Sequence, residues 1–434
     1  MKISIQKSKI NGKIIAPSSK SYTHRAITIA ALSSNSTVIN PLISKDTEAT
    51  IDACRAFGAD IQKKENELII KGVKGKPQIP DNVIDVKNSG TTLRIMTAIF
   101  AFVDGVTVLT GDSSIIKRPN NPLLLALNNL GINAYSTRNN GCAPIIVNGG
   151  KIKCNKISID GSISSQFISA LLISCPLIKT EKQEIITISI IGELKSRPYV
   201  DITLELLNNV GAKIEVKEKG DLKFIISTNQ TYHLKEYTVP GDFSSASYLL
   251  AAGAMIENSD ITLKNVFPSK QGDAEIINIL KKMGADIVWD SEGGIVTVKY
   301  AGKLHGITVD VGKTPDLVPT IAVLGCVAEG TTIIENAAHV RLKETDRLHA
   351  MAVELKKMGV DITEELDKLS IKGGTLKWGA DLHGWEDHRI VMSLTLAGLV
   401  VGNATIDTAE SVAISYPDFF DVMKRCGADI KILD

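Results

Sequence analysis

LKKMGADI (residues 280–287) returns almost unchanged as LKKMGVDI (residues 355–362), and this pair decides the fold. Four further segments share the pattern: CRAFGADI (54–61), LNNLGINA (127–134), LLNNVGAKI (206–214) and MKRCGADI (423–430). In every copy the residues one and four positions before the glycine are apolar or cysteine. The pattern predicts a helix with one buried stripe, a glycine in a left-handed conformation just past its end, and then a strand. Six copies predict a repeat architecture.

A second element recurs with the same period. Polar residues precede an almost wholly apolar stretch at 19–32, 88–102, 164–174, 242–256, 315–325 and 387–401. A helix that is apolar on all sides is a buried helix, so its polar start must point to a site or to solvent. If three units form each of two domains, three helix N-termini per domain can converge. Their unpaired N–H groups and positive dipole ends favour anions.

A lysine lies 13 to 16 residues ahead of five of the six glycines, at positions 45, 117, 195, 270 and 343. The sixth position holds Ile414. The fifth of these lysines, Lys343, begins the segment KETDR (343–347), in which further charged residues follow it. Thr345 or Asp346 is suited to cap the helix that follows, which is the structural interpretation of this cluster. The functional interpretation is that the cluster acts on a charged substrate.

Composition limits the possible partners. At 434 residues the chain exceeds what one hydrophobic core usually supports, so two domains are expected. The formal net charge of +1 gives no global field for nucleic acid or an anionic membrane. Six scattered cysteines predict reduced thiols, and the N-terminal residues show no signal-peptide pattern. We expect a cytoplasmic protein that binds neither nucleic acid nor membrane, and a monomer.

Standard motifs are mostly absent. GKT at 312–314 lacks the glycine-rich lead of a phosphate loop and is followed by Pro315. His383 and His388 stand five apart, which does not fit the i, i+4 face of a zinc helix. We therefore expect no metal and no cofactor. What remains is a set of helix starts rich in cations, together with two carboxylates, Asp316 and Glu344, suited to proton transfer.

Nine of these segments carry a family resemblance. PSSKSYTHRA, NSGTTLR, KRP, SSQF, SRPYVDIT, PGDFSSASY, PDLVPT, RLKETDRL and DHRIVM resemble, in order, the motifs of the EPSP synthases, the 3-phosphoshikimate 1-carboxyvinyltransferases. The resemblance implies an α/β (α+β) fold: a two-domain, inside-out α/β barrel of six βαβαββ repeats. We predict one domain at 18–238 and a second formed by 1–17 with 239–434.

The resemblance also implies a reaction, namely transfer of the enolpyruvyl group of phosphoenolpyruvate to the 5-hydroxyl of shikimate 3-phosphate with release of phosphate, in the pathway to chorismate and aromatic amino acids. By motif match, shikimate 3-phosphate would contact Lys20, Ser21, Arg25, Ser164, Ser165, Gln166, Ser196, Tyr199, Asp316, His339 and Lys343. Phosphoenolpyruvate would contact Lys20, Asn88, Gly90, Arg118, Gln166, Arg347 and Arg389. Asp316, Glu344 and Lys20 would be catalytic, with Asp316 as base and Glu344 as acid.

Two positions depart from the family pattern: His339 replaces an expected asparagine, and Ile414 an expected lysine. Two alternatives are open at this point. One is the enolpyruvyl transferase that acts on UDP-N-acetylglucosamine, but that family typically has a cysteine in the loop matching GDSSIIKRPN (111–120), which has none here. The other is a non-catalytic anion-binding protein of the same fold. Loss of Lys20, Asp316 or Glu344 would be expected there, and all three are present.

Overall fold

The computed structural model describes residues 1–182, 184–374 and 376–433. It divides the chain into two compact units, Met1–Ser19 with Pro240–Asp434 (unit 1) and Lys20–Val239 (unit 2). The boundaries predicted from the sequence lie within two residues of these. Each unit has its own hydrophobic core.

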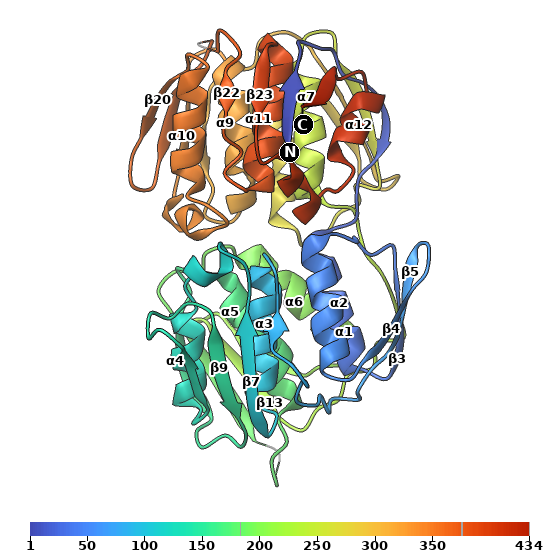
Figure 1. Ribbon diagram of the computed structural model, residues 1–434, viewed down its shortest axis with the longest axis vertical. Helices are drawn as coiled ribbons and strands as arrows, with labels where there is room; N and C mark the ends of the chain where they lie inside the picture. The colour runs from blue at the N-terminus through green and yellow to red at the C-terminus, as the bar shows by residue number, and fades with distance from the viewer. Residues whose placement is uncertain (183, 375, 434) are drawn as a thin grey trace. The chain divides into compact units, whose positions relative to one another are not determined.

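Unit 2 alternates helices with short strands (Figure 1). Its helices are α1 (Lys20–Leu32), α2 (Lys45–Ala56), α3 (Gly90–Phe100), α4 (Asn121–Asn129), α5 (Ser165–Ser174) and α6 (Arg197–Asn209), with 3-10 turns η1 (Ile115–Lys117) and η2 (Cys175–Leu177). Its strands are β3 (Asn35–Ile39), β4 (Asp60–Lys63), β5 (Glu67–Lys71), β6 (Ile84–Asp85), β7 (Gly105–Thr110), β8 (Asn133–Ser136), β9 (Ile145–Gly149), β10 (Lys156–Asp160), β11 (Ile185–Ile191), β12 (Ile214–Lys217), β13 (Lys223–Ser227) and β14 (Glu236–Thr238).

Unit 1 repeats the same order of elements. Its helices are α7 (Phe243–Met255), α8 (Ile276–Lys282), α9 (Val318–Val327), α10 (Arg347–Lys357), α11 (His388–Val401) and α12 (Phe419–Arg425), with 3-10 turns η3 (Gly272–Glu275), η4 (Pro315–Leu317), η5 (Ala338–Leu342) and η6 (Ala409–Ile414). Its strands are β1 (Lys2–Ile5), β2 (Asn11–Ile15), β15 (Asp260–Lys264), β16 (Asp286–Asp290), β17 (Ile295–Lys299), β18 (Thr308–Asp310), β19 (Thr331–Glu335), β20 (Asp361–Glu364), β21 (Leu369–Lys372), β22 (Asp381–Leu382), β23 (Ala404–Ile406) and β24 (Ile430–Leu433).

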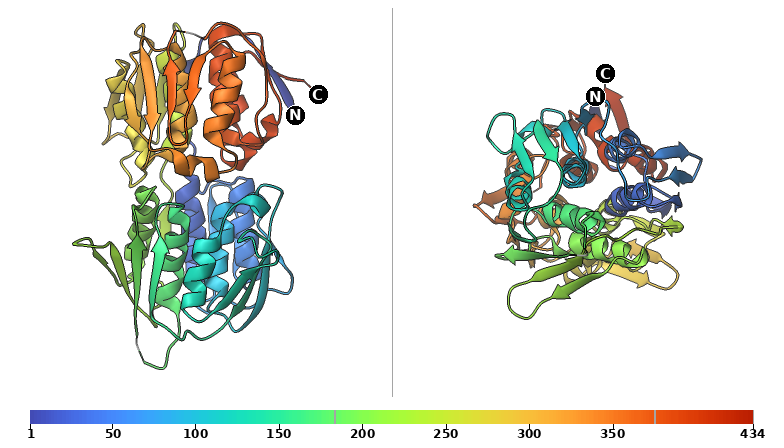
Figure 2. Two further views of the ribbon diagram at one scale, coloured as in Figure 1. Left: turned by 90° about the vertical axis from the view of Figure 1, so that its left-hand side faces the viewer. Right: turned by 90° about the horizontal axis from the view of Figure 1, so that it is seen from below.

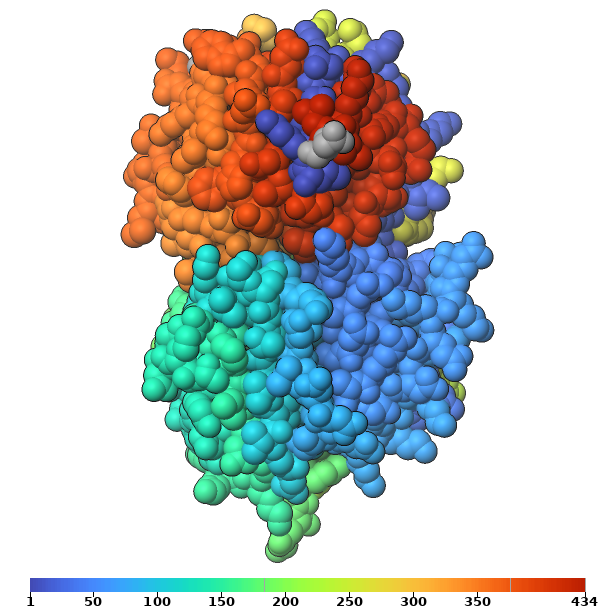
Figure 3. Space-filling view, viewed as in Figure 1, coloured from blue at the N-terminus to red at the C-terminus, as the bar shows by residue number. Residues whose placement is uncertain are grey.

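Among the described residues, three four-stranded sheets lie at the outside of each unit, around a centre of buried helices (Figure 2). Strand orders such as β6-β7-β9-β8 and β18-β19-β21-β20 combine one parallel and two antiparallel pairs. In unit 1 the N-terminal strand β1 lies between β23 and β24, so N-terminal and C-terminal residues share one surface (Figure 3). The fold is the predicted inside-out arrangement of six repeats.

All six repeat glycines have the predicted left-handed conformation, with φ between 81° and 107°. The apolar helices α1, α3 and α5 of unit 2, and α7, α9 and α11 of unit 1, are the buried ones, and every residue of α7 is buried. The six cysteines are free thiols. Because the side chains along these helices are committed to the cores, polar chemistry is concentrated at the helix ends.

Candidate functional site

The predicted site residues of unit 2 lie at helix starts. Lys20, Gly90 and Ser165 are the first residues of α1, α3 and α5. Ser164 caps α5, where its hydroxyl accepts from the backbone N–H of Gln166 at 3.3 Å. Ser196 caps α6 in a left-handed conformation (φ 54°). Each helix start therefore presents backbone N–H groups or hydroxyls that suit an anion.

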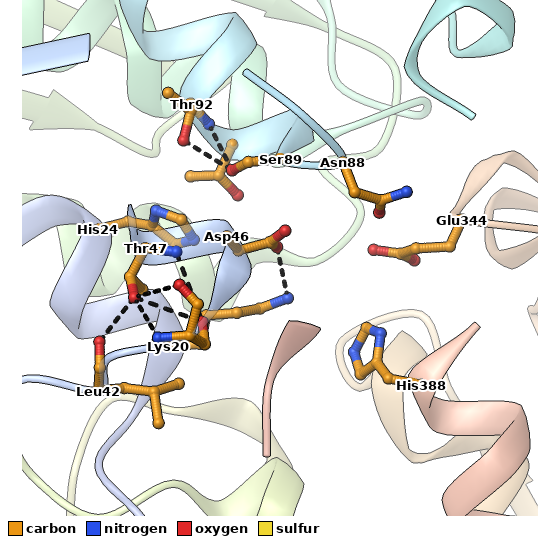
Figure 4. Close-up of polar contacts among 12 residues, drawn as sticks. Lys20, His24, Leu42, Asp46, Thr47, Asn88, Ser89, Thr92, Glu344 and His388 are labelled. Atoms are coloured by element: carbon orange, nitrogen blue, oxygen red, sulfur yellow. Dashed lines mark hydrogen bonds and ion pairs between the residues drawn. The ribbon is translucent and has the colours of Figure 1, made fainter. Parts of the chain in front are cut away.

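Lys20 is held by a carboxylate that the sequence analysis missed. Its Nζ lies 2.9 Å from Oδ2 of Asp46, the second residue of α2, and both side chains are largely buried (Figure 4). The other oxygen, Oδ1, is buried and has no hydrogen-bond partner among the described residues. Its neighbour Lys45 occupies a recurring lysine position, which was the available signal. The pairing fixes the ammonium group at the start of α1.

Arg118 is oriented by two neighbours. Its guanidinium donates to the side-chain oxygen of Asn88 at 3.0 Å and to Ser114 Oγ at 2.8 Å. A Cβ on Gly90 would lie 3.1 Å from Nη1 of Arg118 and 2.8 Å from Nη1 of Arg94. Glycine at position 90 therefore gives two guanidinium groups access to the backbone at the start of α3.

Arg94 is a second residue that the sequence analysis did not assign. Its Nη1 donates to Oε1 of Gln166 at 2.5 Å, and its Nε donates to Asn120 Oδ1 at 3.2 Å. Gln166 in turn donates through Nε2 to Thr91 Oγ1 at 3.1 Å. The guanidinium also lies over the Phe167 ring. Arg94 thus sets the orientation of the Gln166 amide, a predicted substrate contact.

Arg25 is largely committed to internal contacts. It donates through Nε to Thr203 Oγ1 at 2.7 Å and through its terminal nitrogens to the carbonyls of Ser21 and Tyr199 and to Ser169 Oγ. Burial lowers the pKa of this guanidinium to about 10, although the hydroxyls of Tyr199 and Tyr22 act in the opposite direction. Arg25 joins α1, α5 and α6, so it positions their starts.

In unit 1, one buried guanidinium contacts three carboxylates. Arg347 donates to Asp316 Oδ1 at 2.8 Å, to Glu344 Oε2 at 2.5 Å and to Asp387 Oδ2 at 2.8 Å. Its neighbour Arg389 donates to the other oxygen of Asp316 at 2.9 Å. Asp316 therefore bridges the two arginines that the sequence predicted as phosphoenolpyruvate ligands.

The charges of this cluster set its protonation. Burial alone would raise the pKa of Asp316, but Arg389, Lys343 and Arg347 outweigh it and hold that pKa well below its usual range. Burial lowers the pKa of Lys343, while Asp316 opposes the shift. The carboxylate of Asp316 is thus ionised at neutral pH, and the Lys343 ammonium is easier to deprotonate than a solvated one.

The segment KETDR combines both interpretations made from the sequence. Asp346 caps α10, accepting from the backbone N–H of His349 at 3.0 Å, and it pairs with Arg341. Glu344, two residues earlier, turns to Arg347 instead. The other predicted residue of this region, His339, is buried in η5. One carboxylate of the segment is structural, and the other belongs to the charged cluster.

A buried carboxyl group near the cluster was also missed. Asp273, in η3, is fully buried and accepts from the hydroxyl of Ser244. Burial, reinforced by the charge of Asp316, raises its pKa to about 7, against the opposing effect of Arg389. Because a lone aspartate after a glycine has no characteristic spacing, the sequence held no signal for it.

Residues 5–423 of the chain match the family model described as EPSP synthase (3-phosphoshikimate 1-carboxyvinyltransferase). Proteins named 3-phosphoshikimate 1-carboxyvinyltransferase from Methanococcoides burtonii and Methanosarcina acetivorans are 64% and 63% identical to it, with 99% of each chain covered. A solved EPSP synthase structure from Acinetobacter baumannii is 28% identical, with a TM-score of 0.81 over 99% of this chain and 100% of that one.

Proposed function

The chain belongs to the EPSP synthase (3-phosphoshikimate 1-carboxyvinyltransferase) family, and from this premise we propose how its own residues bind the two substrates and move the protons. The enzyme transfers the enolpyruvyl group of phosphoenolpyruvate to the 5-hydroxyl of shikimate 3-phosphate and releases phosphate. The observation that carries the assignment of roles is the contact of both Asp316 and Glu344 with Arg347.

The phosphate of shikimate 3-phosphate would bind at the starts of α5 and α6. Ser164, Ser165 and Ser196 supply hydroxyls there, and the helix starts add N–H groups and a positive dipole end. The remaining polar groups of this acceptor would meet Ser21, Tyr199 and Gln166, with His339 and Lys343 also assigned to it. Arg25 would act mainly by holding the three helices in place, because most of its donors are already used.

Phosphoenolpyruvate would bind to arginines, whose planar donors match carboxylate and phosphate oxygens. Arg118 is held for this role by Asn88, next to Gly90. Arg347 and Arg389 are paired with carboxylates in this structure. An arriving anion would compete with Glu344 for Arg347, which releases the Glu344 carboxyl for proton transfer.

The proton balance then follows from the reaction. As the 5-hydroxyl oxygen bonds to C2 of phosphoenolpyruvate, Asp316 accepts the hydroxyl proton and Glu344 gives a proton to C3. In the second step the C2–O bond to phosphate breaks and C3 returns a proton to the Glu344 carboxylate, which forms the enol ether of the product. The proton held by Asp316 leaves with the phosphate, so both carboxyl groups end in their starting protonation states. The ammonium of Lys20, fixed by Asp46, would stabilise the negative charge that develops on the leaving phosphate.

The proposal also includes the oligomeric state of the enzyme and its location in the cell. No helix among the described residues is long and apolar enough to cross a membrane. The formal net charge of +1 is too small to attract nucleic acid to the protein as a whole. We propose that the enzyme works as a monomer in the cytoplasm. Light scattering coupled to gel filtration tests the monomer: a mass near 46.7 kDa is expected, and a doubled mass would contradict it.

The test of the roles is Glu344→Gln, matched to Glu364→Gln, which alters a carboxylate paired with Arg341. Phosphate release from phosphoenolpyruvate with shikimate 3-phosphate should fall about 100-fold or more in the first variant, the usual scale for a general acid, and hardly in the second. Both variants should bind shikimate 3-phosphate. Normal turnover of Glu344→Gln would remove this residue from the chemistry. UDP-N-acetylglucosamine offered as acceptor should give no phosphate release.

A further inference from the structure

Unit 1 contains a cavity at the C-terminal ends of its three buried helices, the opposite end from the charged cluster. Its volume is about 450 Å³, within the range of small-molecule sites. Met255 and Ile256 at the end of α7, Val327 at the end of α9, and Leu399 and Val400 near the end of α11 form its apolar wall.

The rim of this cavity is charged and polar. Lys7 and Lys9 come from the loop between β1 and β2, while Glu257 follows α7 and Tyr300 follows β17. Within the described part of the chain, neither lysine forms an ion pair and neither does Glu257, whereas other exposed charges are paired, such as Lys299 with Asp260 at 3.1 Å. Three charges are therefore available to a ligand at one opening.

The loop that carries the two lysines is fixed in place. Ser8, between them, donates its N–H to the carbonyl of Leu399 at 3.0 Å, and its hydroxyl accepts from the N–H of Asp429 at 3.0 Å. A Cβ on Gly402, just past α11, would approach the backbone nitrogen of Lys7 to 2.9 Å. The backbone between the two lysines is therefore held against the end of α11 and against Asp429, which keeps both residues at the rim of the cavity.

The equivalent place in unit 2 is filled. There the ends of α1, α3 and α5 meet around a space of only about 30 Å³, lined among others by Pro77, Phe102 and Leu177. No lysine or carboxylate lines that space. Because the two units repeat the same order of elements, the fold itself does not require an opening at the helix ends. The cavity therefore results from the particular side chains of unit 1, not from the repeat fold that both units share.

We propose that this cavity binds a free α-amino acid with a large apolar side chain. The wall of helix ends takes the apolar side chain, and Lys7 and Lys9 take the carboxylate. Glu257 takes the ammonium group, which the negative dipole ends of α7, α9 and α11 also favour. The site is separate from the proposed catalytic residues and does not rest on their roles.

The test is calorimetric titration of the full chain with L-leucine and L-phenylalanine. We expect saturable binding with a Kd below about 1 mM, and at least about tenfold weaker binding of glycine, which lacks the apolar side chain. 4-Methylpentanoate lacks the ammonium group and 3-methylbutylamine lacks the carboxylate, so both should also bind more weakly than leucine.

Three variants separate this site from unspecific binding. Lys7→Ala combined with Lys9→Ala should weaken leucine binding about tenfold or more, and Val400→Trp should abolish it by filling the space. Lys431→Ala, which removes an exposed lysine of β24, is the matched control and should bind leucine normally. Unchanged phosphate release shows that each variant is folded. Absence of saturable binding, or equal binding by the double lysine variant, would overturn the proposal, and equal affinity for 4-methylpentanoate would overturn the assignment to an amino acid.

Discussion

Arg347 and Asp387 form a fully buried, two-point ion pair. Nε of Arg347 lies 2.8 Å from Oδ2, and Nη2 lies 3.3 Å from Oδ1, with side-chain exposures of 1% and 0%. Arg347 is the first residue of α10, and Asp387 caps α11 by accepting from the N–H of Arg389 at 2.8 Å. The pair therefore joins the starts of two helices that carry predicted substrate ligands.

Asp387→Ala should destabilise the protein by about 3 kcal/mol or more, because it leaves a buried guanidinium with less compensation and removes a helix cap. Urea denaturation followed by circular dichroism measures the change. Asp418→Ala is the matched control, since Asp418 caps α12 without a side-chain hydrogen bond. Equal stability of the two variants would show that Asp316 and Glu344 alone compensate Arg347.

Gly90→Ala should weaken the use of phosphoenolpyruvate. The added Cβ would approach Nη1 of Arg94 to 2.8 Å and Nη1 of Arg118 to 3.1 Å, so at least one guanidinium must move. We expect the KM for phosphoenolpyruvate to rise about tenfold or more, with little change for shikimate 3-phosphate. Gly12→Ala, whose Cβ would meet only Cys426 Sγ at 3.3 Å, is the control. A parallel rise in both KM values would point to a general disturbance of α3.

Asp273→Asn should stabilise the protein in a pH-dependent way. The folded-state pKa of Asp273 is raised to about 7 from 3.8, so the folded state holds a proton that the unfolded state releases between these values. The cost is absent below the unfolded pKa and grows as the pH rises towards 7, where it reaches on the order of 1–4 kcal/mol.

Asparagine does not ionise, so the gain in the free energy of unfolding should be present at pH 8 and should vanish near pH 4. Urea denaturation at several pH values measures it. Asp286→Asn, an exposed position on β16, is the control and should show no such dependence. A gain that is independent of pH would mean that the pKa of Asp273 is the same in the folded and unfolded states.

Ile414→Lys should lower the KM for phosphoenolpyruvate, with little effect on that for shikimate 3-phosphate. Ile414 ends η6 at the sixth of the recurring lysine positions, and it is 5% exposed. A hydrogen bond to a charged group contributes about 1.5–3 kcal/mol, up to about a hundredfold in affinity. Steady-state kinetics decide the matter, with Ile414→Met as the control for side-chain length. An unchanged or higher KM would mean that this position does not reach the substrate.

The sequence alone was sufficient for the repeat architecture. Each repeat glycine needs a left-handed backbone directly after a helix, and this requirement is local, so the spacing of Gly58, Gly284 and the other copies predicted six equivalent helix ends. A cap on α10 at Thr345 or Asp346 was predictable for the same reason, because a cap acts within one turn of its own helix, and the structure shows that Asp346 is the cap. The stretches that are apolar on all sides likewise identified which helices are buried.

The tertiary structure decided which charges meet. Arg94 and Gln166 are 72 residues apart in sequence, Lys20 and Asp46 are 26 apart, and Asp316 meets Arg389 across 73. No local pattern encodes such pairs, since they depend on how whole repeats pack against each other. Burial is decided in the same way: the pKa of Asp273 rises because packing excludes water from its carboxyl group, and its immediate neighbours in the sequence do not reveal this.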